Sequence, residues 1–105
     1  LQTPLKFYKC VMNDSSFFGL KMKDLVIKEC QAQSVDFREG HFQGANFVKT
    51  DLSDSLFMQT DLEHSDFTDA THYAIDIRFN KVTQAKFSRF EALNLLALLE
   101  IDLVD

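Results

Sequence analysis

The sequence repeats with a period of five residues. In the stretch ANFVKTDLSDSLFMQTDLEHSDF, residues 45–67, every fifth position is phenylalanine or leucine, and the residue two positions before it is small. Residues five apart drift around a helix, which advances about 100° per residue, and they alternate between the two faces of a strand. Neither element uses this pattern alone, so the period predicts a solenoid of short stacked repeats.

The same phase continues over most of the chain. We call the large residue of each five-residue unit its centre. Two positions before the centre stands a small residue in most units, for example Cys10, Ala45, Thr50 and Ser65. The seventeen centres follow one another without insertion: Phe7, Met12, Phe17, Met22, Ile27, Ala32, Phe37, Phe42, Phe47, Leu52, Phe57, Leu62, Phe67, His72, Ile77, Val82 and Phe87.

The units resemble those of the pentapeptide-repeat family, which read Ala-(Asp or Asn)-(Leu or Phe)-X-X. ANFVK, TDLSD and TDLEH are close matches, and the resemblance covers about residues 5–89. It implies an all-β solenoid, a right-handed quadrilateral β-helix of about four coils with four units in each coil. The centre and the small residue would point inward, and the other side chains would point outward.

A coil of four such units contains twenty residues, and this predicts which residues are stacked. Neighbouring coils should lie about 4.8 Å apart, so residues twenty apart should form columns. One predicted column is apolar: Phe7, Ile27, Phe47, Phe67 and Phe87. Another alternates in charge: Lys9, Glu29, Lys49, Asp69 and Arg89. Opposite charges on adjacent strands are mildly favourable, so this column supports the twenty-residue coil.

Residues 88–105, SRFEALNLLALLEIDLVD, abandon the period. Ser88 followed by Glu91 is the pattern of a capping box and predicts a helix from about Arg89 to about Glu100. The tail EIDLVD alternates apolar and acidic residues and predicts a short edge strand. We therefore expect a β-helix over residues 1–88 and a capping and dimerisation helix with a tail strand over residues 89–105. The helix face expected to cover the end of the coils comprises Ala92, Leu95, Leu96 and Leu99.

The segment YAIDIRFNKVTQAKFSRFEALNLLALLEIDL resembles the C-terminal end of the quinolone-resistance (Qnr/MfpA-like) branch of the family. That resemblance implies a homodimer joined head to head through the C-terminal helix. It also implies a function: an acidic rod that mimics duplex DNA, binds DNA gyrase or topoisomerase IV, and shields the enzyme from quinolones or inhibits it. The residues expected to face the partner are Leu93, Leu96, Ala97 and Leu98.

The charge distribution is compatible with this function. Sixteen acidic and eleven basic residues give a net charge of −5, which argues against direct binding of nucleic acid. Residues 31–70 carry eight acidic residues against Arg38 and Lys49, about one net charge per ~1.6 Å of axis, whereas duplex DNA carries one per ~1.7 Å. Residues 1–30 are net positive, which opposes mimicry. We call the six candidate binding residues the acidic belt: Asp36, Asp51, Asp54, Asp61, Asp66 and Asp69.

A different interpretation of the same residues stays open. Four of the belt aspartates stand just before a centre, where a short carboxylate can accept a hydrogen bond from turn backbone. The protein would then be a structural or adaptor solenoid whose acidic residues serve solubility. Its contact site would be apolar, formed by outward residues that share one face: Phe18, Leu56, Met58 and Phe79.

The sequence does not favour an enzyme. It contains no Ser–His–Asp order, Gly-rich phosphate loop, paired-carboxylate pattern or zinc-ligand spacing, so we expect no catalytic residue, metal, cofactor or small-molecule substrate. Cys10 and Cys30 should stack on adjacent coils as reduced thiols, and His72 should be an inward polar residue at an irregular coil. No apolar run approaches ~18 residues and no leader is visible, so we expect a cytoplasmic protein without a membrane span.

Overall fold

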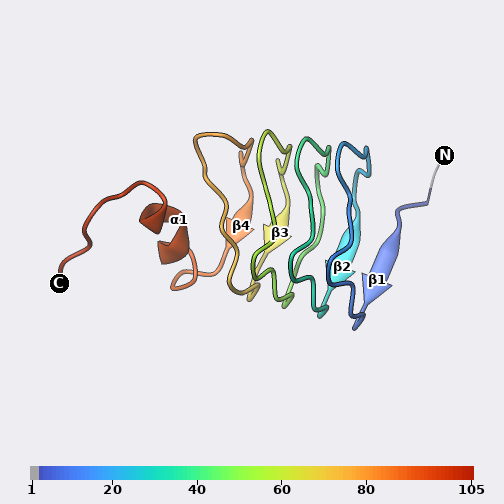
Figure 1. Cartoon of the computed structure of the whole chain (residues 1–105), viewed down its shortest axis with the longest axis horizontal. Helices are drawn as coiled ribbons and strands as arrows, with labels where there is room; N and C mark the ends of the chain where they lie inside the picture. The colour runs from blue at the N-terminus through green and yellow to red at the C-terminus, as the bar shows by residue number, and fades with distance from the viewer. Residues whose placement is uncertain (1–2) are drawn as a thin grey trace.

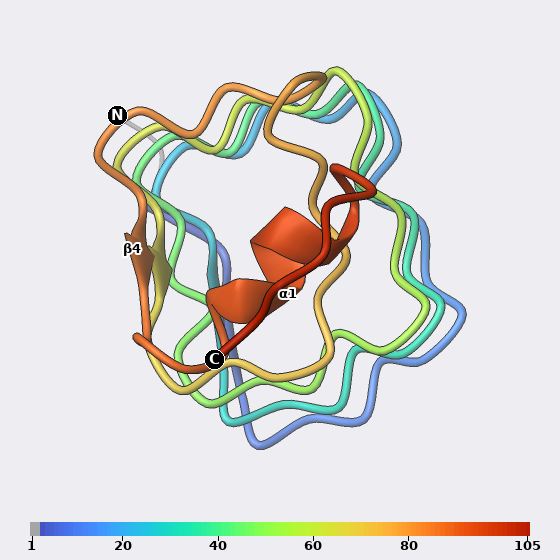
Figure 2. The ribbon, with the colours of Figure 1, turned by 90° about the vertical axis from the view of Figure 1, so that its left-hand side faces the viewer.

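The computed structural model describes residues 3–105, which form a rod of stacked coils with a short helix at one end (Figure 1). The rod measures 48 × 24 × 22 Å along its principal axes. Viewed along the rod, successive coils follow the same four-sided outline (Figure 2). The predicted solenoid is therefore confirmed.

The pairing of strands confirms the twenty-residue coil. Strand β1 (Lys6–Tyr8) pairs in parallel with β2 (Val26–Lys28), and β3 (Asp66–Phe67) pairs in parallel with β4 (Lys86–Phe87). Single-residue bridges, such as those of Gln31 with Asp51 and Asp61 with Lys81, join further residues twenty apart. Each strand is only two or three residues long because the chain turns a corner after every unit.

The rod has four sides, each named by its column of centres. On each face, the residues immediately before and after a centre flank it and form a flanking pair. Face A contains Phe7, Ile27, Phe47, Phe67 and Phe87; face B contains Met12, Ala32 and Leu52; face C contains Phe17, Phe37 and Phe57; face D contains Met22, Phe42, Leu62 and Val82.

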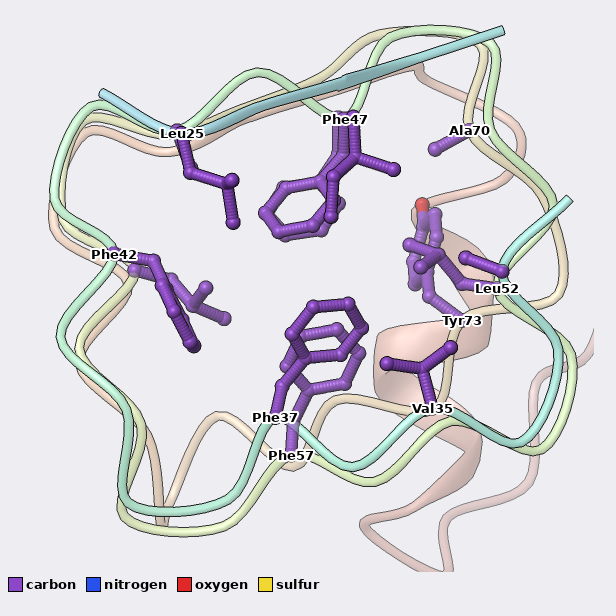
Figure 3. Packing of buried hydrophobic residues seen from close by; sticks show 14 of the residues in the cluster. Leu25, Val35, Phe37, Phe42, Phe47, Leu52, Phe57, Ala70 and Tyr73 are labelled. Atoms are coloured by element: carbon purple, nitrogen blue, oxygen red, sulfur yellow. The ribbon is translucent and has the colours of Figure 1, made fainter. Parts of the chain in front are cut away.

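Two stacks of phenylalanine rings fill the rod (Figure 3). On face A, the ring centroids of Phe47 and Phe67 are 4.8 Å apart and nearly parallel. On face C, those of Phe37 and Phe57 are 5.0 Å apart. The two stacks meet edge to face, with Phe37 and Phe47 at 5.5 Å and 87°. These are the favourable aromatic geometries, so the column of centres explains the core.

The small residues join neighbouring coils by hydrogen bonds. The hydroxyl of Thr50 donates to the carbonyl oxygen of Ile27 at 2.6 Å and accepts from the N–H of Cys30 at 3.2 Å. Ser55 does the same for Ala32 and Val35. A buried corner leaves these backbone groups without other partners, so a short hydroxyl side chain satisfies them where a larger one would not fit.

Each regular unit ends in a residue of left-handed backbone conformation. This holds for the thirteen units from Lys9 to Asp69, at the second position after each centre. The left-handed region is adopted most readily by glycine and tolerated by aspartate and asparagine. Gly44 meets this need, and a Cβ atom there would also contact the carboxylate of Asp24.

The coil after residue 70 departs from the predicted phase. His72 was predicted to point inward, but its side chain is exposed and its backbone is left-handed. Tyr73 takes the inward place at 2% exposure, whereas Ile77, also predicted as a centre, is 38% exposed. The ring of Tyr73 packs 5.9 Å from that of Phe67, a contact that a polar imidazole would replace poorly. The phase prediction was wrong at these two centres.

The C-terminal part also differs from prediction. The helix α1 spans Leu93–Ala97, not residues 89–100, and its N-cap Ala92 makes no side-chain capping bond. The capping box is wrong because the hydroxyl of Ser88 bonds Asp69 instead. Residues 101–105 form no strand, since no neighbouring strand lies along them. Leu95 packs against the core, as expected of a residue that covers the coil stack.

Candidate functional site

Four of the acidic-belt residues stabilise turns. Each precedes a centre, and its Oδ1 accepts a hydrogen bond from the backbone N–H two residues further on. This confirms the structural interpretation of these four positions and gives them a role that does not depend on any ligand. The bonds are Asp36 with Arg38 at 3.0 Å, Asp51 with Ser53 at 3.0 Å, Asp61 with Glu63 at 3.1 Å and Asp66 with Thr68 at 2.9 Å.

The other two belt residues, Asp54 and Asp69, are the exposed ones. Both end a unit, with φ of 59° and 58°, and both project from a corner of the rod. The hydroxyl of Ser88 donates to the carboxylate of Asp69 at 3.2 Å. Asp54 and Asp69 are therefore the belt carboxylates best placed to meet another molecule.

Asp51 is held by an unusually complete set of donors. Its carboxylate accepts from the hydroxyl of Ser53 at 2.6 Å and the amide of Gln33 at 3.1 Å, and it lies 3.2 Å from Nδ1 of His72. Chiefly because of the Ser53 hydroxyl, the pKa of Asp51 is lowered to about 2. Asp61 is 8% exposed and accepts from Gln43 at 2.7 Å.

The structure distributes the belt around the rod. Asp51 and Asp54 lie on face B, Asp36 on face C, Asp61 on face D, and Asp66 and Asp69 on face A. The belt therefore encircles the middle coils and does not converge on one point. Its chemical capacity is electrostatic: a ring of negative potential that a basic surface could contact from several sides.

Over the whole length of the rod, faces A and B have opposite charge. Face B carries three acidic residues and no lysine or arginine: Asp14, Asp51 and Asp54. Face A carries three acidic residues, Glu29, Asp66 and Asp69. Six basic residues outnumber them there: Lys6, Lys9, Lys28, Lys49, Lys86 and Arg89. Sequence reasoning missed this asymmetry, which summing charge by columns of twenty would have revealed.

The charge column that supported the coil length makes no ion pairs. Lys9, Glu29, Lys49 and Asp69 are stacked as predicted, since the N–H of Lys49, for example, donates to the carbonyl of Thr68 on the next coil. Within residues 3–105, however, the ion pairs are those of Arg38 with Asp36 and Arg78 with Asp76, and Nδ1 of His72 lies 3.2 Å from the carboxylate of Asp51. The column thus contributes at most weak, screened attraction.

The predicted dimer residues lie at the helical end of the rod. Leu93 and Ala97 are exposed, and Leu96 and Leu98 are half-buried. Further large apolar side chains are exposed there, which the prediction of a tail strand did not anticipate. They are Phe90 at 83%, Ile101 at 49%, Leu103 at 56% and Val104 at 90%.

The cysteines act as members of the small-residue columns. Both are free, and the N–H of Cys10 donates to Sγ of Cys30 at 3.4 Å, in the way that Thr50 accepts from Cys30. Burial raises the pKa of the Cys30 thiol. Among residues 3–105, no three His, Cys, Asp or Glu side chains are grouped so that they could hold a metal ion. The same part of the chain includes no helix with the length and hydrophobicity to cross a bilayer.

Comparison with known proteins agrees with the fold. A family model described as the pentapeptide repeat region matches residues 2–67. The chain belongs to the pentapeptide-repeat family. No curated protein matches this pentapeptide-repeat chain.

Several solved structures are similar to this pentapeptide-repeat chain. A trypsin-treated form of QnrB1, a plasmid-mediated fluoroquinolone resistance protein, is 18% identical, with 94% of this chain and 68% of that chain covered and a TM-score of 0.40. Full-length QnrB1 is 19% identical, with 90% and 68% covered and a TM-score of 0.34. The pentapeptide repeat protein Rfr23 from the cyanobacterium Cyanothece 51142 is 9% identical, with 85% and 64% covered and a TM-score of 0.35.

Proposed function

We propose that this pentapeptide-repeat protein binds a type II topoisomerase, DNA gyrase or topoisomerase IV, as a mimic of duplex DNA, and thereby affects quinolone action. The observation that carries the proposal is the acidic belt around a straight rod 24 × 22 Å in cross-section. In the middle coils the net charge per length, about one per ~1.6 Å, matches the ~1.7 Å of a duplex. A basic DNA-binding groove would meet carboxylates where it normally meets phosphates.

The charge asymmetry orients the rod in such a groove. Face B, which carries only acidic charge, would lie against the basic floor. The net positive face A adjoins it and would be turned to the side, with Asp69 at the corner between the two faces. Asp54 projects from face B and would make direct ion pairs. Asp51 on the same face stays ionised in neutral solution, since its pKa is far below 7. Asp54 would therefore contribute an exposed charge that contacts the partner directly, and Asp51 a charge held in place by its hydrogen bonds.

A homodimer joined at the helical end would lengthen the mimic. The exposed apolar residues there, among them Phe90 and Leu93, form a surface that a second copy would cover. The predicted contact residues Leu93, Leu96, Ala97 and Leu98 belong to the same end. Such a dimer would place an acidic belt on each side of its centre, in a cytoplasmic protein that shares a compartment with topoisomerases.

Gyrase supercoiling assays, with and without a fluoroquinolone, test the proposal. We expect inhibition of supercoiling or relief from the drug at micromolar protein, weakened by Asp54→Lys with Asp69→Lys. The matched control is Asp24→Lys, which changes the same exposed, left-handed position outside the belt. Equal activity of the belt variant and the control, or no effect of the unmodified protein, would contradict the proposal.

The alternative is an adaptor solenoid that docks through apolar side chains of face C. The observation in its favour is the exposure of Phe18, Leu56, Met58 and Phe79 on that face, each between 43% and 51%. A salt titration of a captured partner distinguishes the two functions. Binding to the belt should weaken steeply as salt rises because screening acts on exposed charges, whereas apolar docking should not.

A further inference from the structure

Face C combines apolar and charged side chains in alternating coils. One coil places Phe18 outward, the next Asp36 and Arg38, and the third Leu56 and Met58. The fourth coil, which contains the irregular segment, again presents an acid and an arginine, Asp76 and Arg78. No other face exposes so many large apolar residues, and none has its charges paired in this way within residues 3–105.

The two arginines of face C are fixed in place before any partner arrives. Arg38 donates to Asp36 through Nε at 3.0 Å and Nη2 at 2.9 Å, and its guanidinium carbon lies 5.6 Å from the ring centroid of Phe18. Two-point bonding and contact with an aromatic ring hold the side chain in one orientation. A partner that bound here would lose little side-chain entropy in ordering it.

Arg78 repeats the bonding to an aspartate, with the aromatic ring supplied by the next residue rather than by the preceding coil. It donates to Asp76 through Nε at 3.0 Å and Nη2 at 2.8 Å, and its guanidinium carbon lies 5.4 Å from the ring centroid of Phe79. The Asp76–Arg78 pair persists although the register has slipped, since the N–H of Gln59 donates to Phe79 rather than to Arg78. Face C thus has two preformed acid–base pairs with an apolar pair between them.

Three of the four flanking pairs of face C are complementary to themselves; the exception is Ser16 with Phe18. Two rods packed face to face and parallel are related by a two-fold axis along the rods, which exchanges the two members of every flanking pair. Asp36 then lies opposite the partner's Arg38, Leu56 opposite the partner's Met58, and Asp76 opposite the partner's Arg78. Acid meets base and apolar meets apolar at each of these levels, the self-complementarity that a two-fold interface requires.

Other arrangements fail the same test. On face D, the parallel two-fold places Lys21 opposite the partner's Lys23 and Asp61 opposite the partner's Glu63, so like charges meet. On face C with the rods antiparallel and centred on the coil of Leu56, acid would meet acid, because Asp36 would face the partner's Asp76. Of the arrangements compared, charge complementarity therefore favours face C with the rods parallel.

We propose that a second copy of this chain docks on face C, side by side and parallel. Four flanking pairs about 4.8 Å apart on a face of this width give roughly 400 Å² per copy. That is below the area of standard stable interfaces, so the association is weak and depends on concentration. It uses one acidic-belt residue, Asp36, and Arg78, which donates to the carbonyl oxygen of Leu98 at the helical end at 3.2 Å. It does not use Asp54 or Asp69, the belt residues that the supercoiling test changes, so the two proposals can be tested separately.

Sedimentation velocity combined with small-angle X-ray scattering tests the proposal on the whole chain. A side-by-side pair keeps a longest dimension near the 48 Å of one rod, whereas a pair joined at the helical end roughly doubles it. We expect Leu56→Glu to weaken self-association by about tenfold or more, since it places a charge in the apolar centre of the interface. The control is Val11→Glu, an exposed apolar residue in the same position of a unit on face B.

A charge exchange tests the orientation. The double change Asp36→Arg with Arg38→Asp preserves complementarity within a pair of identical copies, so they should associate about as well as unchanged copies. Mixed with the unchanged protein, it places like charges opposite each other at two points, and mixed pairs should be at least about tenfold weaker. Circular dichroism of the variant checks that the coil is intact.

Three results would overturn the proposal. The first is a monomer at all concentrations up to the solubility limit. The second is a pair that has the doubled length and is unaffected by Leu56→Glu. The third is mixed pairs as strong as identical ones. Because Leu56→Glu leaves the belt residues unchanged, supercoiling inhibition by that variant reports on the proposed function separately.

Discussion

The middle coils, residues 25–70, and the coil that follows them obey the same rules to different degrees. In the middle coils each centre is apolar and buried, from Ile27 to Phe67. At residue 72 the centre is a histidine, and the backbone adjusts so that Tyr73 fills the interior instead. The comparison shows that filling the core with an apolar side chain matters more than keeping the five-residue spacing. When the residue at a centre is polar, the chain shifts its phase.

The two regions also differ in how their backbone groups are satisfied. The middle coils use one small hydroxyl at each of several corners, as at Thr50 and Ser65. At the irregular coil the larger side chain of Asn80 takes over, donating to Phe57 at 3.3 Å and to Asp76 at 2.9 Å while accepting from Thr60. One amide side chain thus bonds three backbone groups at this corner.

The largest expected effect comes from opening the aromatic stack. Phe47→Ala should lower the free energy of unfolding by about 3–5 kcal/mol, because it removes a fully buried ring that contacts others on both sides. Phe87→Ala, at the half-buried end of the same stack, should cost clearly less. Urea unfolding measures both, and equal losses would show that the stack is no stronger in the middle than beyond the irregular coil.

A smaller effect is expected at the hydroxyl corners. Thr50→Val keeps the shape of the side chain but leaves the carbonyl of Ile27 and the N–H of Cys30 without their partner, at a cost of about 1–3 kcal/mol. Thr50→Ser is the control and should cost much less because the hydroxyl remains. If valine were tolerated as well as serine, these bonds would not be what selects small polar residues.

The regular part of the fold was readable from the sequence because each unit carries the same information. Centres, small residues and turn aspartates recur often enough that one weak unit does not alter the phase. The slip at His72 was not readable in this way, since choosing Tyr73 as the inward residue depends on contacts with Phe67 and Phe87 from other coils. The interior, not the local sequence, decides between adjacent residues.

The C-terminal part was predicted less well for a similar reason. Ser88 and Glu91 match a capping box, but the Ser88 hydroxyl bonds Asp69, nineteen residues away. A helix as short as α1 is held by its contacts rather than by propensity, so its bounds depend on tertiary structure. Of the candidate site, the turn role of four belt aspartates followed from their position in the unit. The opposite charge of faces A and B can be seen only when charges are summed over columns of residues twenty apart.

The hydrogen-bond donors around Asp51 should make the free energy of unfolding depend on pH in acidic solution. Its pKa of about 2 lies below the ordinary 3.8 of aspartate, so ionised Asp51 stabilises the fold above about pH 4. That contribution is lost as the pH falls from about 4 to about 2. Allowing for its partial exposure, we expect about 1–2 kcal/mol, absent in Asp51→Asn, where the Oδ1 acceptor for Ser53 remains.

Unfolding by urea at a series of acidic pH values measures this contribution. Asp54→Asn is the matched control, because Asp54 lies on the same face but is exposed. The two variants should differ in the slope of stability with pH between about pH 4 and pH 2, and parallel curves would contradict the role given to Ser53, Gln33 and His72.

The smallest expected effect is a gain of stability at the irregular coil. The hydroxyl of Tyr73 is buried and has no hydrogen-bond partner among the described residues, and burial raises the pKa of Tyr73 to about 12. An unpaired buried hydroxyl is costly, so Tyr73→Phe should raise the free energy of unfolding by about 1 kcal/mol. Tyr8→Phe is the control, since Tyr8 is 53% exposed and should show no change. A loss of stability in Tyr73→Phe would mean that the hydroxyl has a hydrogen-bond partner. Tyr73 would then stabilise the irregular coil through its hydroxyl as well as through its buried ring.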